Sequence, residues 1–203
     1  KVPTRHFTLR VFPEREIPEV FWYEDGLGCT LAYQDHEAPL VFLIAGTGSS
    51  HTSPRMVRLQ KAFYQGGFHV ISLTSPTHMD FVVNASTGLP GNSPDDARDL
   101  YRVMELAYRK VRGTIKVSYF ALSGYSLGAF NAAFVARLDE EKKVFDFRRV
   151  LLMNPPVSLY DAVSSLDRLL VENIPGGTEK FDQWFRDVLA KLSWVTKDMG
   201  HME

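Results

Sequence analysis

Cysteine is nearly absent from this sequence, since its 203 residues include one, Cys29. No intramolecular disulfide and no cysteine-based zinc site can form, and a lone cysteine in a strand-like run is most often a small core residue. The chain also lacks an excess of either charge, because 23 basic and 24 acidic residues give a formal net charge of −1. With no block rich in lysine and arginine, binding to nucleic acid is not expected.

Long hydrophobic runs are missing as well. No apolar segment approaches the roughly 20 residues that a membrane-spanning helix needs, and no signal peptide is visible. The lack of a membrane span predicts a soluble protein. Its compartment stays open between the cytoplasm and, because the chain begins at Lys1 and not at Met, the periplasm or the exterior after removal of a leader. The hydrophobic content of 45% and the charged content of 23% are typical of a globular domain with a sizeable core.

Strand and helix patterns alternate over the first three quarters of the chain. We predict strands at residues 5–12, 28–33, 40–45, 69–73, 116–122 and 150–153. We predict helices that begin at Ser53-Pro54 and at Ser93-Pro94, and a third over residues 127–137. Residues 74–92 are polar and rich in turn formers, which predicts a long loop. Such alternation, with strands that are apolar on both faces, predicts an α/β fold with a largely parallel sheet.

The pattern changes after Pro156. Two stretches with helical spacing of apolar residues, 159–170 and 181–192, follow each other with no strand between them. We therefore expect two amphipathic helices, separated by Pro175-Gly176-Gly177.

The segment Gly124-Tyr125-Ser126-Leu127-Gly128 carries the strongest chemical signal. It lies at a predicted strand-to-helix junction, where a very tight turn holds the serine in a strained backbone conformation and projects its Oγ above the sheet edge. The flanking glycines allow the strand and the helix to pack closely, and the free N–H groups of the helix start favour a developing oxyanion.

A second glycine-rich loop, Gly46-Thr47-Gly48, follows the apolar run at residues 40–45. Acyl transfer needs two backbone N–H donors on the oxyanion, and we expect them from Leu127 and Thr47, with Gly48 as the alternative to Thr47. No Gly-Lys-Ser/Thr follows this loop, which excludes a P-loop, and its glycine spacing does not favour dinucleotide binding.

With these two motifs and the strand that leads into Asn154-Pro155-Pro156, the chain resembles the α/β-hydrolase superfamily over about residues 5–157. Within it, the chain resembles bacterial serine esterase-like proteins. The resemblance implies a three-layer fold around an eight-stranded, mostly parallel sheet. It also implies a Ser–His–acid mechanism with Ser126 as nucleophile, Leu127 and Thr47 as oxyanion donors, a small ester or acyl compound as substrate, and no metal or cofactor.

The superfamily order is serine, then acid, then histidine, and this chain departs from it. The only histidine after Ser126 is His201, and no convincing strand follows Met153. Our first interpretation is that residues 1–157 form an incomplete hydrolase core and residues 158–203 a helical cap or lid segment after the sixth strand. The acid and base would then lie beyond residue 203, and the chain would be inactive as it stands.

Two other interpretations stay open. In a compact enzyme, His201 would pair with Asp182 or Asp198. In a non-catalytic α/β-hydrolase-like binding module, no base would be needed.

Two earlier histidines are also candidates for the pocket or the base. His51 follows the glycine loop and His78 lies in the long polar loop, although a base at either position would break the superfamily's chain order. Our hypothesis is a serine hydrolase that cleaves an ester or thioester through an acyl-enzyme on Ser126. An acyltransferase would use the same nucleophile.

Overall fold

The computed structural model describes residues 2–17, 19 and 26–199, with the side chains of 192–199 excepted. The chain divides into two compact units, Lys1–Pro156 and Val157–Glu203.

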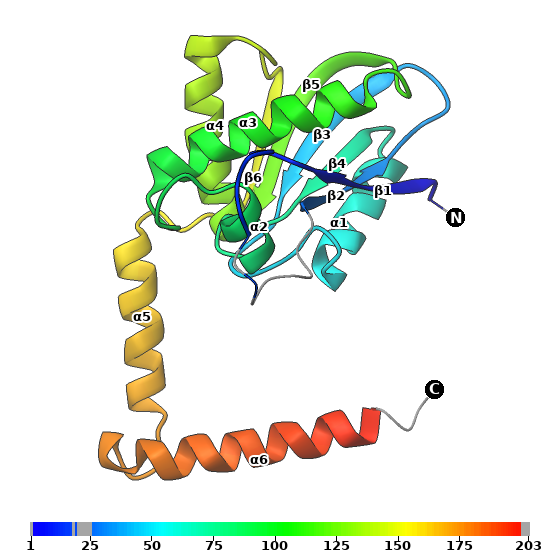
Figure 1. The fold of residues 1–203 in the computed structure, drawn as a ribbon. Helices are drawn as coiled ribbons and strands as arrows, with labels where there is room; N and C mark the ends of the chain where they lie inside the picture. The colour runs from blue at the N-terminus through cyan, green and yellow to red at the C-terminus, as the bar shows by residue number, and fades with distance from the viewer. Residues whose placement is uncertain (1, 18, 20–25, 200–203) are drawn as a thin grey trace. The chain divides into compact units, whose positions relative to one another are not determined.

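The first unit is built on a six-stranded sheet (Figure 1). Its strands, in chain order, are β1 (Thr4–Leu9), β2 (Leu27–Ala32), β3 (Ala38–Ile44), β4 (His69–Leu73), β5 (Val117–Tyr125) and β6 (Arg149–Met153). Their order across the sheet is β1-β2-β4-β3-β5-β6. The β1–β2 and β2–β4 pairs are antiparallel, whereas β4, β3, β5 and β6 run parallel to one another. The carboxyl ends of the four parallel strands therefore share one edge of the sheet.

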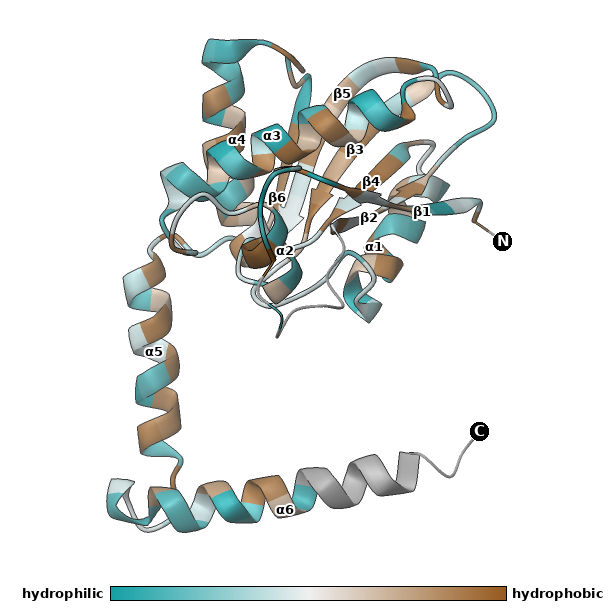
Figure 2. Cartoon of the chain, in the orientation of Figure 1, coloured by the Kyte–Doolittle hydropathy of each residue, from teal (hydrophilic) through white to brown (hydrophobic). Residues whose placement is uncertain are grey.

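Helices cover both faces of this sheet (Figure 1). They are α1 (Pro54–Gln65), α2 (Met79–Asn84), α3 (Ser93–Val111) and α4 (Leu127–Lys142). Alternate residues of β3 face opposite layers: Leu40 and Phe42 join the core formed with α3 and α4, while Val41 and Leu43 pack in the cluster that contains Met56 of α1. Figure 2 shows the resulting hydrophobic centre of the sheet. Burial on both faces explains the uninterrupted apolar run, and the predicted three-layer α/β fold is confirmed.

Two expectations need correction. The predicted loop at residues 74–92 contains the short helix α2, which begins after His78. The His78 side chain accepts a hydrogen bond from the Asp80 N–H at 3.1 Å and so caps this helix. The buried Phe81 attaches α2 to the core, a tertiary contact that local composition does not reveal. The eight-stranded sheet that the resemblance implies is also not seen, since the described residues of the first unit contribute six strands.

The second unit consists of α5 (Leu159–Glu172), a 3-10 turn (Thr178–Lys180) and α6 (Phe181–Met199). Both helices were predicted from the apolar spacing. Ser158 is the N-cap of α5, and its Oγ accepts a hydrogen bond from the Asp161 N–H at 3.2 Å. The interpretation of this unit as a cap or lid stays a prediction. Of the helices in the described residues, none has the length and apolar character needed to cross a membrane.

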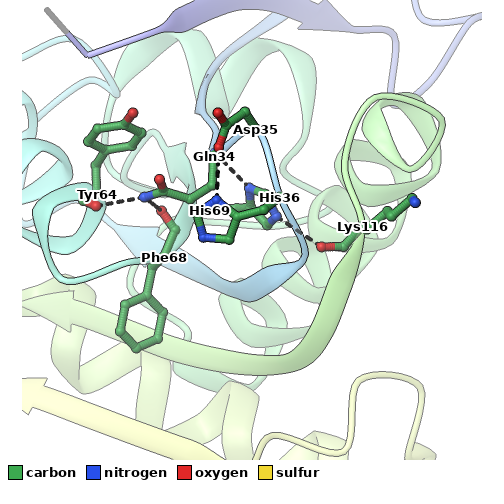
Figure 3. A network of polar contacts seen from close by, with 7 residues as sticks. All are labelled: Gln34, Asp35, His36, Tyr64, Phe68, His69 and Lys116. Carbon is green, nitrogen blue, oxygen red and sulfur yellow. Dashed lines mark hydrogen bonds and ion pairs between the residues drawn. The ribbon is translucent and has the colours of Figure 1, made fainter.

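A polar network joins three strand connections near the amino ends of the parallel strands (Figure 3). The buried imidazole of His69 accepts a hydrogen bond at Nδ1 from the Gln34 N–H and donates one from Nε2 to the Lys116 carbonyl oxygen, both at 3.0 Å. The Gln34 side-chain amide donates to the carbonyl oxygens of Tyr64 and Phe68, at 2.7 and 3.3 Å. Residues far apart in the chain are thereby held at one end of the sheet.

Substitution of His69 by leucine should destabilise the protein. The change leaves two backbone groups without partners, the Gln34 N–H and one acceptor position on Lys116, at a cost of about 2–4 kcal/mol. Urea denaturation followed by circular dichroism measures the free energy of unfolding. His36→Leu is the matched control, because this exposed histidine contacts the exposed Asp35 and should change stability by no more than about 0.5 kcal/mol. Equal effects of the two substitutions would contradict the role given to His69.

Candidate functional site

Ser126 lies between the end of β5 and the start of α4, with φ 54° and ψ −126°. A positive φ is strained for a residue with a side chain, at a cost of roughly 1–3 kcal/mol. Hydrogen bonds maintain the turn: the Ser126 N–H donates to the Met153 carbonyl at 2.9 Å, and the Ser126 carbonyl accepts from Ala129 and Phe130 at 3.0 and 3.1 Å. The end of β6 and the first turn of α4 together hold the serine in this conformation.

The two glycines that flank Ser126 make the turn sterically possible. A Cβ atom at Gly124 would clash with the backbone of Gly128, which lies in the first turn of α4. A Cβ atom at Gly128 would clash with the carbonyl oxygens of Ile44 and Ala45. The first turn of α4 thus lies against both β5, the strand that precedes it, and the carboxyl end of β3.

The glycine loop after β3 lies beside the same turn. A Cβ at Gly46 would come within 2.6 Å of Cε2 of Tyr125, the residue before Ser126. The Gly48 N–H donates a hydrogen bond to Thr77 Oγ1 at 2.9 Å, so this amide already has a partner. Among the described residues, the Thr47 N–H donates no hydrogen bond. Leu127 is the first residue of α4, where backbone N–H groups have no carbonyl four residues earlier within the helix.

Ser126 lines a cavity of about 400 Å³. The other residues that line it come from α1, β5 and the end of β6, and they are Arg55, Arg58, Leu59, Tyr125, Met153 and Asn154. The lining is therefore cationic, with two arginines and no acidic side chain. The sequence pattern did not indicate either arginine, because the periodicity of α1 predicts only which of its faces is apolar. Their spacing of three residues on a helix that follows the glycine loop indicates that both arginines share one helix face near that loop.

Neither His51 nor His78 lines this cavity. His51 Nδ1 lies 2.7 Å from Thr30 Oγ1 on β2, and the His51 N–H donates to Thr74 Oγ1 at 3.1 Å. His78 caps α2. His201, the third candidate, lies outside the described residues, as does the side chain of Asp198. The described lining of the cavity therefore includes Ser126 but neither a histidine nor a carboxylate.

No metal-binding cluster of three or more histidine, cysteine, aspartate or glutamate side chains occurs within the described part of the chain. Cys29 is fully buried on β2, and this burial raises the pKa of its thiol well above the usual range. A thiol held in its neutral form is a poor nucleophile, and Cys29 acts as a core side chain.

Comparison with known proteins gives matches among solved structures, whereas no family model and no curated protein matches the chain. An esterase from Pyrococcus furiosus is 13% identical, with a TM-score of 0.55 over 93% of this chain and 62% of that enzyme. A fungal esterase from Rhizomucor miehei is 17% identical, with a TM-score of 0.52 over 83% of this chain and 50% of that one. A thermostable esterase from Pseudomonas putida is 17% identical, with a TM-score of 0.51 over 78% and 45%.

The chain therefore spans between 45% and 62% of the length of these three enzymes. The mostly parallel sheet, with helices on both faces, makes the first unit an α/β protein. The similarity to the three enzymes specifies the fold within this class: the chain has an α/β-hydrolase-like fold, as the sequence motifs predicted.

Substitution of Gly128 by alanine tests the packing at the turn. The new methyl group would meet two carbonyl oxygens at the end of β3, so we expect a loss of about 1–3 kcal/mol in the free energy of unfolding. Gly113→Ala is the control, since no atom lies within 4 Å of a Cβ at that position. Thermal and urea unfolding of both variants measure the difference. A Gly128→Ala protein as stable as the control variant would show that α4 does not approach β3 this closely.

The pH dependence of stability should carry a contribution from His51. Burial, followed by the neighbouring His6 and His78, lowers the pKa of His51 from 6.5 to about 4. Below pH 6.5 the unfolded chain binds a proton at His51 that the folded protein does not bind until about pH 4. Stability should therefore fall as the pH is lowered through this range, by about 1 kcal/mol from this group.

Urea unfolding at pH 7 and pH 4.5, with His51→Asn alongside the parent protein, isolates this contribution. Asparagine can keep a polar contact with Thr30 but does not titrate, so the variant should lose less stability on acidification. An identical loss in both proteins would contradict the assignment.

Proposed function

We propose that the protein is a serine hydrolase that cleaves a carboxylic ester or thioester through an acyl-enzyme on Ser126. The observation that carries this proposal is the strained backbone of Ser126 at the end of a parallel strand, in a turn that two backbone-packed glycines make possible. Strain of this kind persists only where the surrounding structure enforces it, and it is characteristic of functional positions. The positive φ and the close glycine packing support a nucleophile elbow at Ser126, and the serine lines a cavity large enough for a small substrate.

In the proposed reaction, Ser126 Oγ attacks the carbonyl carbon of the substrate and its proton passes to a general base. The carbonyl oxygen becomes an oxyanion, which the N–H groups of Leu127 and Thr47 stabilise. Collapse of the tetrahedral intermediate breaks the bond to the alcohol or thiol, which leaves with a proton. Water then attacks the acyl-enzyme, releases the acid and restores the serine.

Two further observations support the proposed donors. The Thr47 amide lies on the loop that contacts Tyr125, whereas the Gly48 amide is already bonded to Thr77. The N-terminus of α4 adds the favourable end of a helix dipole next to the reacting oxygen. The likeness to solved esterases agrees with a hydrolase of this type.

Labelling with a fluorophosphonate probe tests the proposal. The full-length protein should gain the mass of one phosphonyl group on the peptide that contains Ser126, because the probe phosphonylates activated serines. Ser126→Ala should abolish labelling, and Ser118→Ala, which removes an exposed hydroxyl from the same strand β5, should leave it intact. If the folded full-length protein stays unlabelled, the hydrolase proposal fails and the binding-module interpretation replaces it.

A further inference from the structure

Two arginines line the Ser126 cavity, and they come from neighbouring positions on one helix. Arg55 and Arg58 lie in the first two turns of α1 at a spacing of three residues, which places them on the same face of the helix. Leu59 extends this face into the cavity. The cavity therefore combines a serine with two fixed positive charges on its wall.

Contacts within the protein orient both side chains but leave their charge available. The Arg55 guanidinium lies 5.3 Å from the ring centroid of Tyr125, which immediately precedes Ser126. Arg58 Nε donates a hydrogen bond to the Pro54 carbonyl oxygen at 3.3 Å, which holds the side chain along the helix. The two terminal nitrogens of Arg58 are left available to a ligand. In the described part of the chain, no carboxylate lies within ion-pair distance of either arginine.

The chemistry of this wall matches a carboxylate. A guanidinium presents a planar fork of N–H donors that fits the two oxygens of a carboxylate, and stacking on an aromatic ring orders it before the ligand arrives. The apolar Leu59 and Met153 line the same cavity and suit a short aliphatic chain between the carboxylate and the reacting carbonyl. No acidic side chain of the lining competes for the arginines.

We propose that Arg55 and Arg58 bind a carboxylate on the substrate. The inference rests on the proposed function and narrows it: the preferred substrates are esters or thioesters of short dicarboxylic acids, with one acid group free. A neutral ester of the same length would lose the contacts with the arginines.

Binding to the Ser126→Ala protein tests this inference without any need for turnover. The probes are monomethyl glutarate and dimethyl glutarate, which differ in one negative charge and one methyl group. Titration of each into ¹⁵N-labelled protein, followed by NMR, should give a Kd for monomethyl glutarate at least about tenfold lower than that for the diester, since charge-assisted hydrogen bonds exceed neutral ones. Added salt should weaken binding of the monoester more than binding of the diester.

Variants identify the residues responsible. In the background of Ser126→Ala, the double substitution Arg55→Gln and Arg58→Gln should reduce the preference to less than about twofold. Arg112→Gln, which removes an exposed arginine at the end of α3, should leave the preference unchanged. Because both arginines are exposed on α1, we expect the double variant to fold, and its ¹⁵N spectrum reports this directly.

Equal affinity for the two esters, or a preference for the monoester that survives in the folded double variant, would overturn the inference. Either result is independent of fluorophosphonate labelling. A labelled Ser126 with no preference for the charged ester would retain the proposed function and discard this substrate class. The opposite combination would retain the carboxylate site and discard the hydrolase.

Discussion

The close approach of the first turn of α4 to the carboxyl end of β3 is the constraint on which the rest of the site depends. At Gly128 the two backbones lie so near that a single methyl group would not fit between them. This contact leaves the chain one short turn in which to pass from β5 into α4, and Ser126 therefore adopts a positive φ. The same contact places the glycine loop beside Tyr125, so that the candidate nucleophile and the candidate oxyanion donors belong to one rigid unit.

The sheet supplies the rigidity that such a turn requires. Its central strands are buried on both faces, and the β3 side chains pack alternately against α1 and against α3 and α4. At the amino ends of the parallel strands, the His69 network ties together connections that are distant in sequence. Well-packed interiors transmit strain instead of absorbing it, so the energy stored at Ser126 is balanced by contacts throughout the unit.

The electrostatic character of the cavity has a separate origin. It arises from α1, whose apolar face packs on the sheet while Arg55 and Arg58 stand at the rim beside Ser126. The helix start of α4 contributes a further favourable environment for negative charge. A polarised ester carbonyl and a substrate carboxylate would therefore meet complementary charge within one cavity, which is the arrangement that orients a small substrate.

The sequence by itself determined the α/β class, the order of most elements and the turn at Ser126. Those features follow from short-range rules: two-sided apolar runs such as β4, a proline at the first position of α1, and glycines placed where a strand meets a helix. The helix α2 was not predictable in this way, because it is short and is held by burial of Phe81 in a distant core.

The surroundings of the site were decided by the tertiary structure. Local sequence patterns do not distinguish His51 from Arg55 and Arg58, since all three are polar residues that follow a glycine loop. Only the packing of α1 against the sheet directs Arg55 and Arg58 to the cavity, while a hydrogen bond to Thr30 on β2 holds His51 elsewhere. The direction of a side chain depends on which elements pack together, and that information comes from contacts between residues far apart in the chain.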